Sequence, residues 1–204
     1  MLVSDSHQFI LFHTAKTGGS SLTYELAKYL NPCYEPPDPT KGFMHMGWQP
    51  IHHIDRIQHR PVQECRHTEF WEPTYFKAAF VRNPFDLVVS AWYDKDVPFE
   101  QFVIKEVASR KNIVSRWGSQ YDYLSDHRKE LMVDWIGKYE QMDKDWEKFC
   151  YMTKIEHNPL KRLNSSWKKP YHEYYNERTY QIVSKLFQKD LQYFGYTLDK
   201  NPDS

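Results

Sequence analysis

The chain has 204 residues, and its 27 Lys and Arg residues balance its 27 Asp and Glu residues to a formal net charge of zero. This length predicts a single domain, residues 1–204, with a core large enough to need no disulfide or metal. The zero charge argues against the broad basic surface that nucleic acids and anionic membranes require, so any anion must be bound at a local site.

Three widely spaced cysteines, Cys33, Cys65 and Cys150, form no CxxC pair. They indicate reduced structural thiols rather than a zinc site or a disulfide framework. No stretch approaches eighteen apolar residues, and the first residues lack a signal-peptide pattern. These features predict a soluble, cytoplasmic chain without a membrane segment, although a trimmed Golgi-lumenal domain would have the same features.

The first predicted unit is a buried strand, a tight loop and a helix. Residues 8–14 form a short, nearly continuous apolar run, which predicts a strand of a parallel sheet. Leu22, Leu26 and Leu30 then recur every four residues and predict a helix that Pro32 ends. A proline-rich loop over 31–42, a short strand over 43–46 and a short helix over 52–58 are expected next.

A second buried strand is predicted over 75–81, followed by a helix over 84–93. Asn83 suits the N-cap, Pro84 the first helical position, and Asp86 a capping box. The remaining expectations are helices over 99–110, 143–152 and 173–190 and a strand over 132–139. Strands that alternate with helices predict an α/β fold with a central, mostly parallel sheet flanked by helices.

The loop after the first strand has the features of an anion site. It combines one lysine, two glycines and three hydroxyl side chains at the start of a helix, in the order Lys16-Thr17-Gly18-Gly19-Ser20-Ser21. Backbone N–H groups at a helix N-terminus bind phosphate or sulfate, and glycines let the backbone approach the anion. The lysine precedes the glycines, which differs from the Walker A order of ATP-binding proteins.

A second anion site is predicted after the strand over 75–81. Arg82 follows the carboxyl end of that strand, where open α/β sheets place their ligands, and Ser90 lies two helical turns further on. An arginine fork with a hydroxyl suits a terminal phosphate monoester. Considered alone, this segment would better suit a capped helix with an arginine salt bridge.

Together, the two motifs resemble those of sulfotransferases that use PAPS (3′-phosphoadenosine 5′-phosphosulfate) as donor. The similarity is to the carbohydrate and heparan 2-O branch and its related bacterial enzymes. A third similarity lies near the C-terminus, in Leu163-Asn164-Ser165-Ser166, Pro170-Tyr171, Tyr174-Tyr175, Lys189-Asp190-Leu191 and Phe194-Gly195-Tyr196. The resemblance implies a P-loop-like three-layer sandwich and transfer of a sulfuryl group to an acceptor hydroxyl, with PAP as the product.

The resemblance also implies roles for individual residues. Lys16 is expected to contact the bridging oxygen of the phosphosulfate and to stabilise the departing phosphate. The residues expected to hold the 5′-phosphate are Thr17, Gly18, Gly19, Ser20 and Ser21. Arg82 and Ser90 are expected to hold the 3′-phosphate. The loop expected to close over the nucleotide contains Asn164, Ser165, Ser166, Lys168 and Lys169. This chain has Ala15 where the family usually has proline, and Leu87 where it usually has arginine.

Sulfuryl transfer also requires removal of the acceptor proton, and histidine suits this near neutral pH. The family's 2-O branch has a catalytic histidine between the two phosphate motifs, so His45 is the first candidate and His52 the second. The alternatives left open in the same interval are His53, His59, His67, Glu64 and Glu69. No metal is expected, because no metal-ligand spacing stands out.

Two other functions remain open at this stage. A P-loop kinase that uses ATP would need a magnesium-binding acid after a strand, for which Asp134 and Glu140 are the only nearby residues. A non-catalytic nucleotide- or glycan-binding module could keep the same fold. For an enzyme, the resemblance favours a sugar or glycan acceptor, on which Trp48, Trp71 or Trp117 could stack.

Overall fold

The computed structural model describes residues 1–31, 60–68, 70–161 and 169–197. Within these ranges the chain builds a four-stranded sheet with strand order β1-β2-β3-β4. The strands are β1 (Leu2–Ser4), β2 (Phe9–Phe12), β3 (Phe76–Val81) and β4 (Trp135–Lys138). β2, β3 and β4 are parallel, and only β1 is antiparallel to its neighbour. The predicted α/β fold with a mostly parallel sheet is therefore confirmed.

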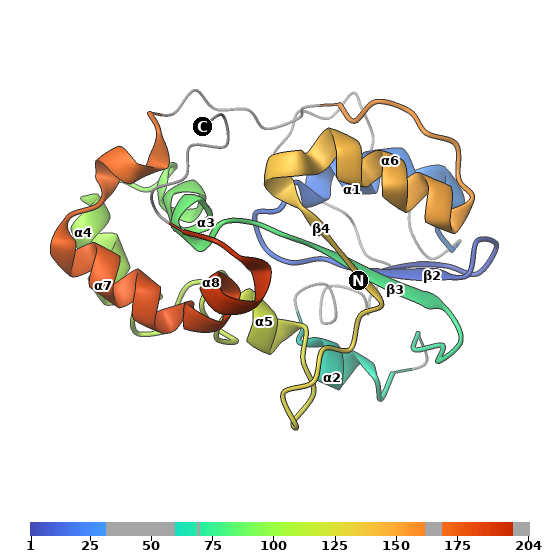
Figure 1. Cartoon of the computed structure of the whole chain (residues 1–204), viewed down its shortest axis with the longest axis horizontal. Helices are drawn as coiled ribbons and strands as arrows, with labels where there is room; N and C mark the ends of the chain where they lie inside the picture. The colour runs from blue at the N-terminus through green and yellow to red at the C-terminus, as the bar shows by residue number, and fades with distance from the viewer. Residues whose placement is uncertain (32–59, 69, 162–168, 198–204) are drawn as a thin grey trace.

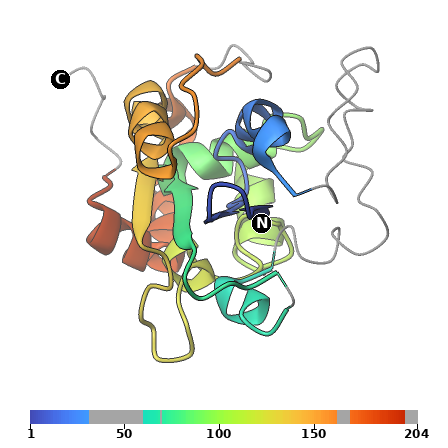
Figure 2. The same cartoon turned by 90° about the vertical axis from the view of Figure 1, so that its right-hand side faces the viewer.

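Helices cover both faces of this sheet (Figures 1 and 2). On one face, α1 (Gly19–Leu26) and α6 (Met142–Thr153) pack their apolar side chains against alternate strand residues. On the other face, the short helices α2 (Val62–Cys65) and α5 (Gln120–Tyr123) contribute to a second core cluster. Successive strand residues point to opposite faces, which is why one sheet supplies both clusters. The expected three-layer sandwich is confirmed.

A third helical group lies beyond the carboxyl ends of the strands and holds its own apolar cluster (Figure 1). It contains α3 (Pro84–Trp92), α4 (Phe99–Phe102), a π-helical turn (Val103–Val107) and α7 (Glu177–Leu186), and α8 (Gln188–Phe194) follows α7. The helix expected over 99–110 is thus α4 continued by a π-helical turn.

The helix expected over 173–190 is interrupted instead of continuous. A 3₁₀ turn, Tyr171–Tyr174, precedes α7. Asn176 then starts α7 with a reciprocal capping box to Thr179, and α7 ends at Leu186, with Phe187 as its C-cap, before α8 begins. A capping box satisfies free backbone N–H groups at a helix start, so it favours a new helix at this point.

The predicted start of α3 is confirmed in two of its three details. Asn83 is the N-cap, its side chain accepts from the Phe85 N–H at 3.0 Å, and Pro84 follows. The capping box with Asp86 is wrong. The Asp86 carboxylate binds the guanidinium of Arg82 instead, a stronger charge-assisted partner. The Asn83 N–H donates to Glu140 Oε1 at 2.6 Å.

The strand expected over 43–46 and the helix expected over 52–58 lie outside the described residues. Among the residues that the structure describes, no helix combines the length and apolar character needed to cross a membrane.

Candidate functional site

The two predicted anion motifs meet at one edge of the sheet. β2 and β3 are adjacent and parallel, so the segments that follow their carboxyl ends start side by side. Arg82, after β3, donates from Nη1 to the carbonyl of Lys16, after β2, at 2.9 Å. The structure therefore brings Lys16 and Arg82 together, as the sequence predicts for a ligand site at a strand edge.

Hydrogen bonds within the protein hold the first loop in shape. The Thr14 hydroxyl donates to the carbonyl of Phe80 in β3, and the buried Thr17 hydroxyl donates to the carbonyl of Thr14 at 2.9 Å. Lys16 adopts φ 60°, a left-handed conformation that costs a non-glycine residue about 1 kcal/mol or more. The Arg82 hydrogen bond to its carbonyl helps to hold it there.

Glycine is required at position 18 for two reasons. Gly18 is the N-cap of α1 with φ 79°, in the left-handed region. A Cβ added there would also lie 3.2 Å from Met142 Cε, at the tight limit of carbon contacts. The following N–H groups of Gly19 and Ser20 have no acceptor within the described residues, as expected for the first turn of a helix. They are available to an anion.

Gly19 lies directly against the ring of His13, the residue that follows β2. A Cβ at position 19 would stand only 1.6 Å from His13 Nε2. The His13 ring therefore occupies the space that a side chain on the first residue of α1 would need.

We expect Gly19→Ala to destabilise the fold by about 2 kcal/mol, because the His13 ring must move out of a packed site. Chemical denaturation of the variant measures this loss. The double variant Gly19→Ala/His13→Ala removes the clash and is expected to recover part of the lost stability. Equal stability of Gly19→Ala and the parent chain would contradict this packing.

Lys16 is the free cation of the loop. Its side chain is exposed and has no salt bridge or hydrogen bond within the described residues. The pKa of the ammonium group is lowered, mainly because nearby protein atoms remove part of its hydration. The negative charge of Asp94 raises this pKa, and the positive charge of Arg82 lowers it further. An anion bound here would supply the partner that the ammonium group lacks.

Arg82 is nearly buried, with its side chain 8% exposed. Nε and Nη2 donate to Asp86 Oδ2 at 2.8 and 2.6 Å, Nη1 donates to Lys16, and the guanidinium lies 4.1 Å from the centre of the Tyr139 ring. These bonds use three of the five N–H donors of arginine. One N–H on each terminal nitrogen is left without a partner in the described part of the chain.

Ser90 lies on the same helical face as Asp86, one turn further along α3. It is only 7% exposed, yet its hydroxyl has no hydrogen-bond partner in the ranges that the structure describes. Within the described residues the fully buried hydroxyls without a partner are those of Thr23 and Ser184, so the Ser90 hydroxyl is not one of them and stays within reach of a ligand. Leu87, on the neighbouring face, belongs to the third apolar cluster.

Two polar residues that had no predicted role support Arg82: Gln120, which contacts it directly, and Asp190, which belongs to the third similarity and acts through Gln120. The Gln120 side chain bonds both the N–H and the carbonyl of Arg82, at 2.9 and 2.7 Å. Asp190 in turn accepts from the Gln120 side chain at 3.0 Å. The pattern Ser119-Gln-Tyr-Asp122 is a capping box that could have located α5, although nothing in the sequence links it to Arg82.

A shallow hollow of about 20 Å³, open to solvent, adjoins the first loop. Its apolar lining comes from Ala15, Leu87, Ile113, Val114 and Trp117. Trp117 is 37% exposed.

Most of the remaining predicted site residues lie outside the described ranges: His45, His52, His53, His59, Glu69, Asn164, Ser165, Ser166 and Lys168. Lys169 is described and exposed. Glu64 and His67 lie in and just after α2, on the face of the sheet opposite to α1 (Figure 1). In the described ranges, no group of three or more His, Cys, Asp or Glu side chains is placed to hold a metal ion.

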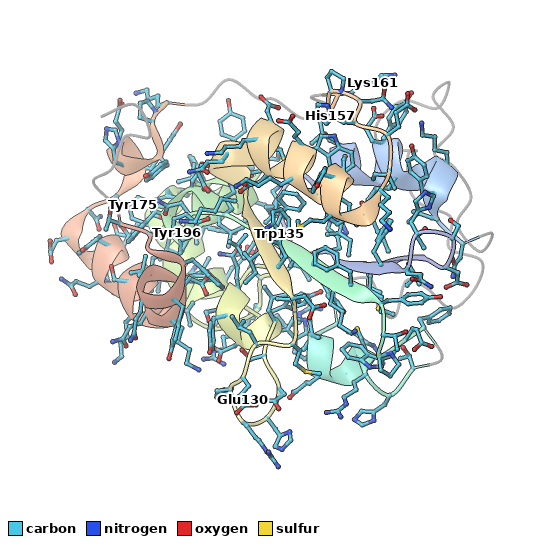
Figure 3. All side chains as sticks on the ribbon, turned by 45° about the vertical axis from the view of Figure 1, so that its right-hand side comes forward. Glu130, Trp135, His157, Lys161, Tyr175 and Tyr196 are labelled. Carbon is cyan, nitrogen blue, oxygen red and sulfur yellow. The ribbon has the colours of Figure 1, made fainter. Side chains whose placement is uncertain are left out.

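The C-terminal segment is tied to this edge of the sheet through tyrosines. The Tyr175 hydroxyl donates to the carbonyl of Phe85, at the start of α3, at 2.9 Å. The Tyr196 hydroxyl donates to Glu140, just after β4, at 3.0 Å. Figure 3 labels both side chains on the side where the C-terminal helices lie. The first of these bonds joins the third similarity noted in the sequence to the second anion motif.

A family model described as "Sulfotransferase family" matches residues 1–197. The chain therefore belongs to the sulfotransferase family, as the resemblance of its motifs implies, and sulfuryl transfer is the activity of its class. No curated protein matches the chain. No solved structure matches it either.

Proposed function

We propose that this protein transfers a sulfuryl group from PAPS to an acceptor hydroxyl, with a sugar or glycan as acceptor and PAP as product. One observation carries the proposal: Lys16, with its free ammonium group, and Arg82, which Ser90 follows two turns later, stand at the same sheet edge, joined by the bond from Arg82 to the Lys16 carbonyl. PAPS carries two separate anionic groups, a 5′-phosphosulfate and a 3′-phosphate. The Lys16 loop would bind the first of these groups, and Arg82 with Ser90 would bind the second.

In this proposal the main chain of residues 17–21 and the hydroxyls of Ser20 and Ser21 hold the 5′-phosphate. The hydroxyl of Thr17 is already used within the loop, so Thr17 contributes through its backbone. The free N–H groups of Arg82 and the hydroxyl of Ser90 hold the 3′-phosphate. Asn164, Ser165, Ser166 and Lys168 remain proposed contacts of a closing loop.

The reaction is an in-line displacement at sulfur. The acceptor oxygen forms the new S–O bond, the bond from sulfur to the bridging oxygen breaks, and the electron pair stays on the 5′-phosphate of PAP. Lys16 stabilises this negative charge as it develops. A base takes the acceptor proton, and His45 and then His52 remain the proposed candidates. Trp117, half-exposed beside the loop, offers an aromatic face for a sugar ring.

The kinase alternative receives less support from the two acids that it would need. Asp134 accepts from the Lys77 N–H at 2.7 Å, at the amino ends of β3 and β4 and away from the loops. Glu140 stands at the carboxyl end of β4, but it already accepts from Asn83 and Tyr196. Neither acid is free to hold magnesium beside Lys16.

A thermal-shift comparison of PAP with ATP and magnesium tests the proposed donor. We expect PAP at about 100 times its dissociation constant to raise the Tm by about 5 °C, because it binds only the folded state. ATP with magnesium is expected to leave the Tm nearly unchanged. Stabilisation by ATP and magnesium but not by PAP would overturn the proposal in favour of a kinase. Binding of PAP without sulfate transfer to any acceptor would favour the non-catalytic module.

A further inference from the structure

The main chain at Arg82 is held by a side chain from a different part of the molecule. β3 ends at Val81, so Arg82 lies beyond the backbone ladder that fixes the strand. The Gln120 amide replaces a neighbouring strand there. Its Oε1 accepts from the Arg82 N–H at 2.9 Å, and its Nε2 donates to the Arg82 carbonyl at 2.7 Å. Gln120 is 5% exposed, so water competes little for these bonds.

Asp190 fixes Gln120 in the orientation that this clamp requires. Asp190 Oδ2 accepts from both Nε2 and the backbone N–H of Gln120 at 3.0 Å, and Oδ1 accepts from the Tyr121 N–H at 2.8 Å. The amide of Gln120 cannot rotate by 180° without placing its oxygen against this carboxylate. Asp190 is fully buried in α8, and burial raises its pKa to about 6, while its hydrogen bonds to Gln120 and Tyr121 favour the ionised form.

A continuous hydrogen-bonded path therefore runs from the C-terminal helix to the loop with the free lysine. It passes from Asp190 to Gln120, from Gln120 to the main chain of Arg82, and from the guanidinium of Arg82 to the Lys16 carbonyl. We infer that Gln120 and Asp190 are positioning residues for donor recognition, and this inference rests on the proposed function. They orient Arg82 toward the 3′-phosphate without touching the donor themselves.

The variant Gln120→Glu tests this role. It keeps the acceptor for the Arg82 N–H but places an oxygen against two acceptors, the Arg82 carbonyl and Asp190 Oδ2. Isothermal titration with PAP and with AMP, which lacks the 3′-phosphate, gives the ratio of the two affinities. We expect the preference for PAP over AMP to fall about tenfold or more, while the affinity for AMP changes less than about threefold. In steady state, the KM for PAPS is expected to rise while kcat stays within about threefold.

Asp190→Asn is the second variant, and Asp134→Asn is the control. Asp134 also accepts a backbone N–H of β3, from Lys77, but at the opposite end of the strand. We expect Asp190→Asn to lower the preference for PAP and Asp134→Asn to leave it unchanged. An unchanged ratio in the folded Gln120→Glu and Asp190→Asn variants would overturn the inference, as would equal losses of PAP and AMP affinity. A parent chain that binds PAP no better than AMP would instead overturn the proposed function.

Discussion

Replacing Lys16 by alanine is expected to lower kcat for sulfate transfer by about 10³-fold, equivalent to about 4 kcal/mol of transition-state stabilisation. The ammonium group is expected to act mainly after the S–O bond begins to break, when charge develops on the bridging oxygen. The KM for PAPS is therefore expected to rise much less than kcat falls. Transfer of ³⁵S from radiolabelled PAPS, measured at saturating donor, gives both quantities.

The fold is expected to tolerate this change. Lys16 is exposed, and its side chain has no salt bridge or hydrogen bond within the described residues. Removing this side chain is therefore expected to change the free energy of unfolding little. Lys28→Ala is the matched control, because it removes the same charge just after α1, where Lys28 is paired with Glu156 at the exposed surface. A Lys16→Ala variant with a kcat close to that of the Lys28→Ala control would contradict the proposed role of the loop.

The sequence predicts the parts of this site that are local in the chain. The strand, the glycine loop and the helix of the first motif are encoded within residues 8–30, and Asn83 and Pro84 mark the start of α3 in the same way. Such signals depend on the backbone conformation and burial of residues that are neighbours in the chain. They can therefore be recognised in the sequence without knowledge of the fold. Three of the four strands of the described sheet were accordingly predicted.

The features that were missed depend on contacts between distant segments. β1 has three residues, too few for an alternating pattern, and it exists because it pairs with β2. Gln120 and Asp190 stand 38 and 108 positions from Arg82 in the sequence, and no local pattern connects them. The partner of Asp86 also escaped prediction, because its choice between a capping box and Arg82 depends on where the Arg82 guanidinium is held.

Arg82→Ala is expected to have the largest effect on donor binding. It removes the contacts proposed for the 3′-phosphate and also the bond that holds the Lys16 carbonyl. We expect the affinity for PAP to fall about 100-fold, equivalent to about 2.7 kcal/mol. The free energy of unfolding is expected to fall by about 2 kcal/mol as well, because Asp86 loses its charged partner. Calorimetric titration and chemical denaturation separate the two losses.

A pair of conservative variants tells phosphate recognition apart from a structural role. Arg82→Lys keeps the positive charge, but one ammonium group cannot bind Asp86, the Lys16 carbonyl and a phosphate with the geometry of a guanidinium fork. We expect its affinity for PAP to fall about tenfold or more. Asp86→Asn weakens the ion pair but keeps every N–H donor of Arg82, so its affinity for PAP is expected to stay within about threefold of the parent. If Asp86→Asn weakened PAP binding as much as Arg82→Lys, then Arg82 would only hold the Lys16 loop in place. The 3′-phosphate would then have to be bound by other residues.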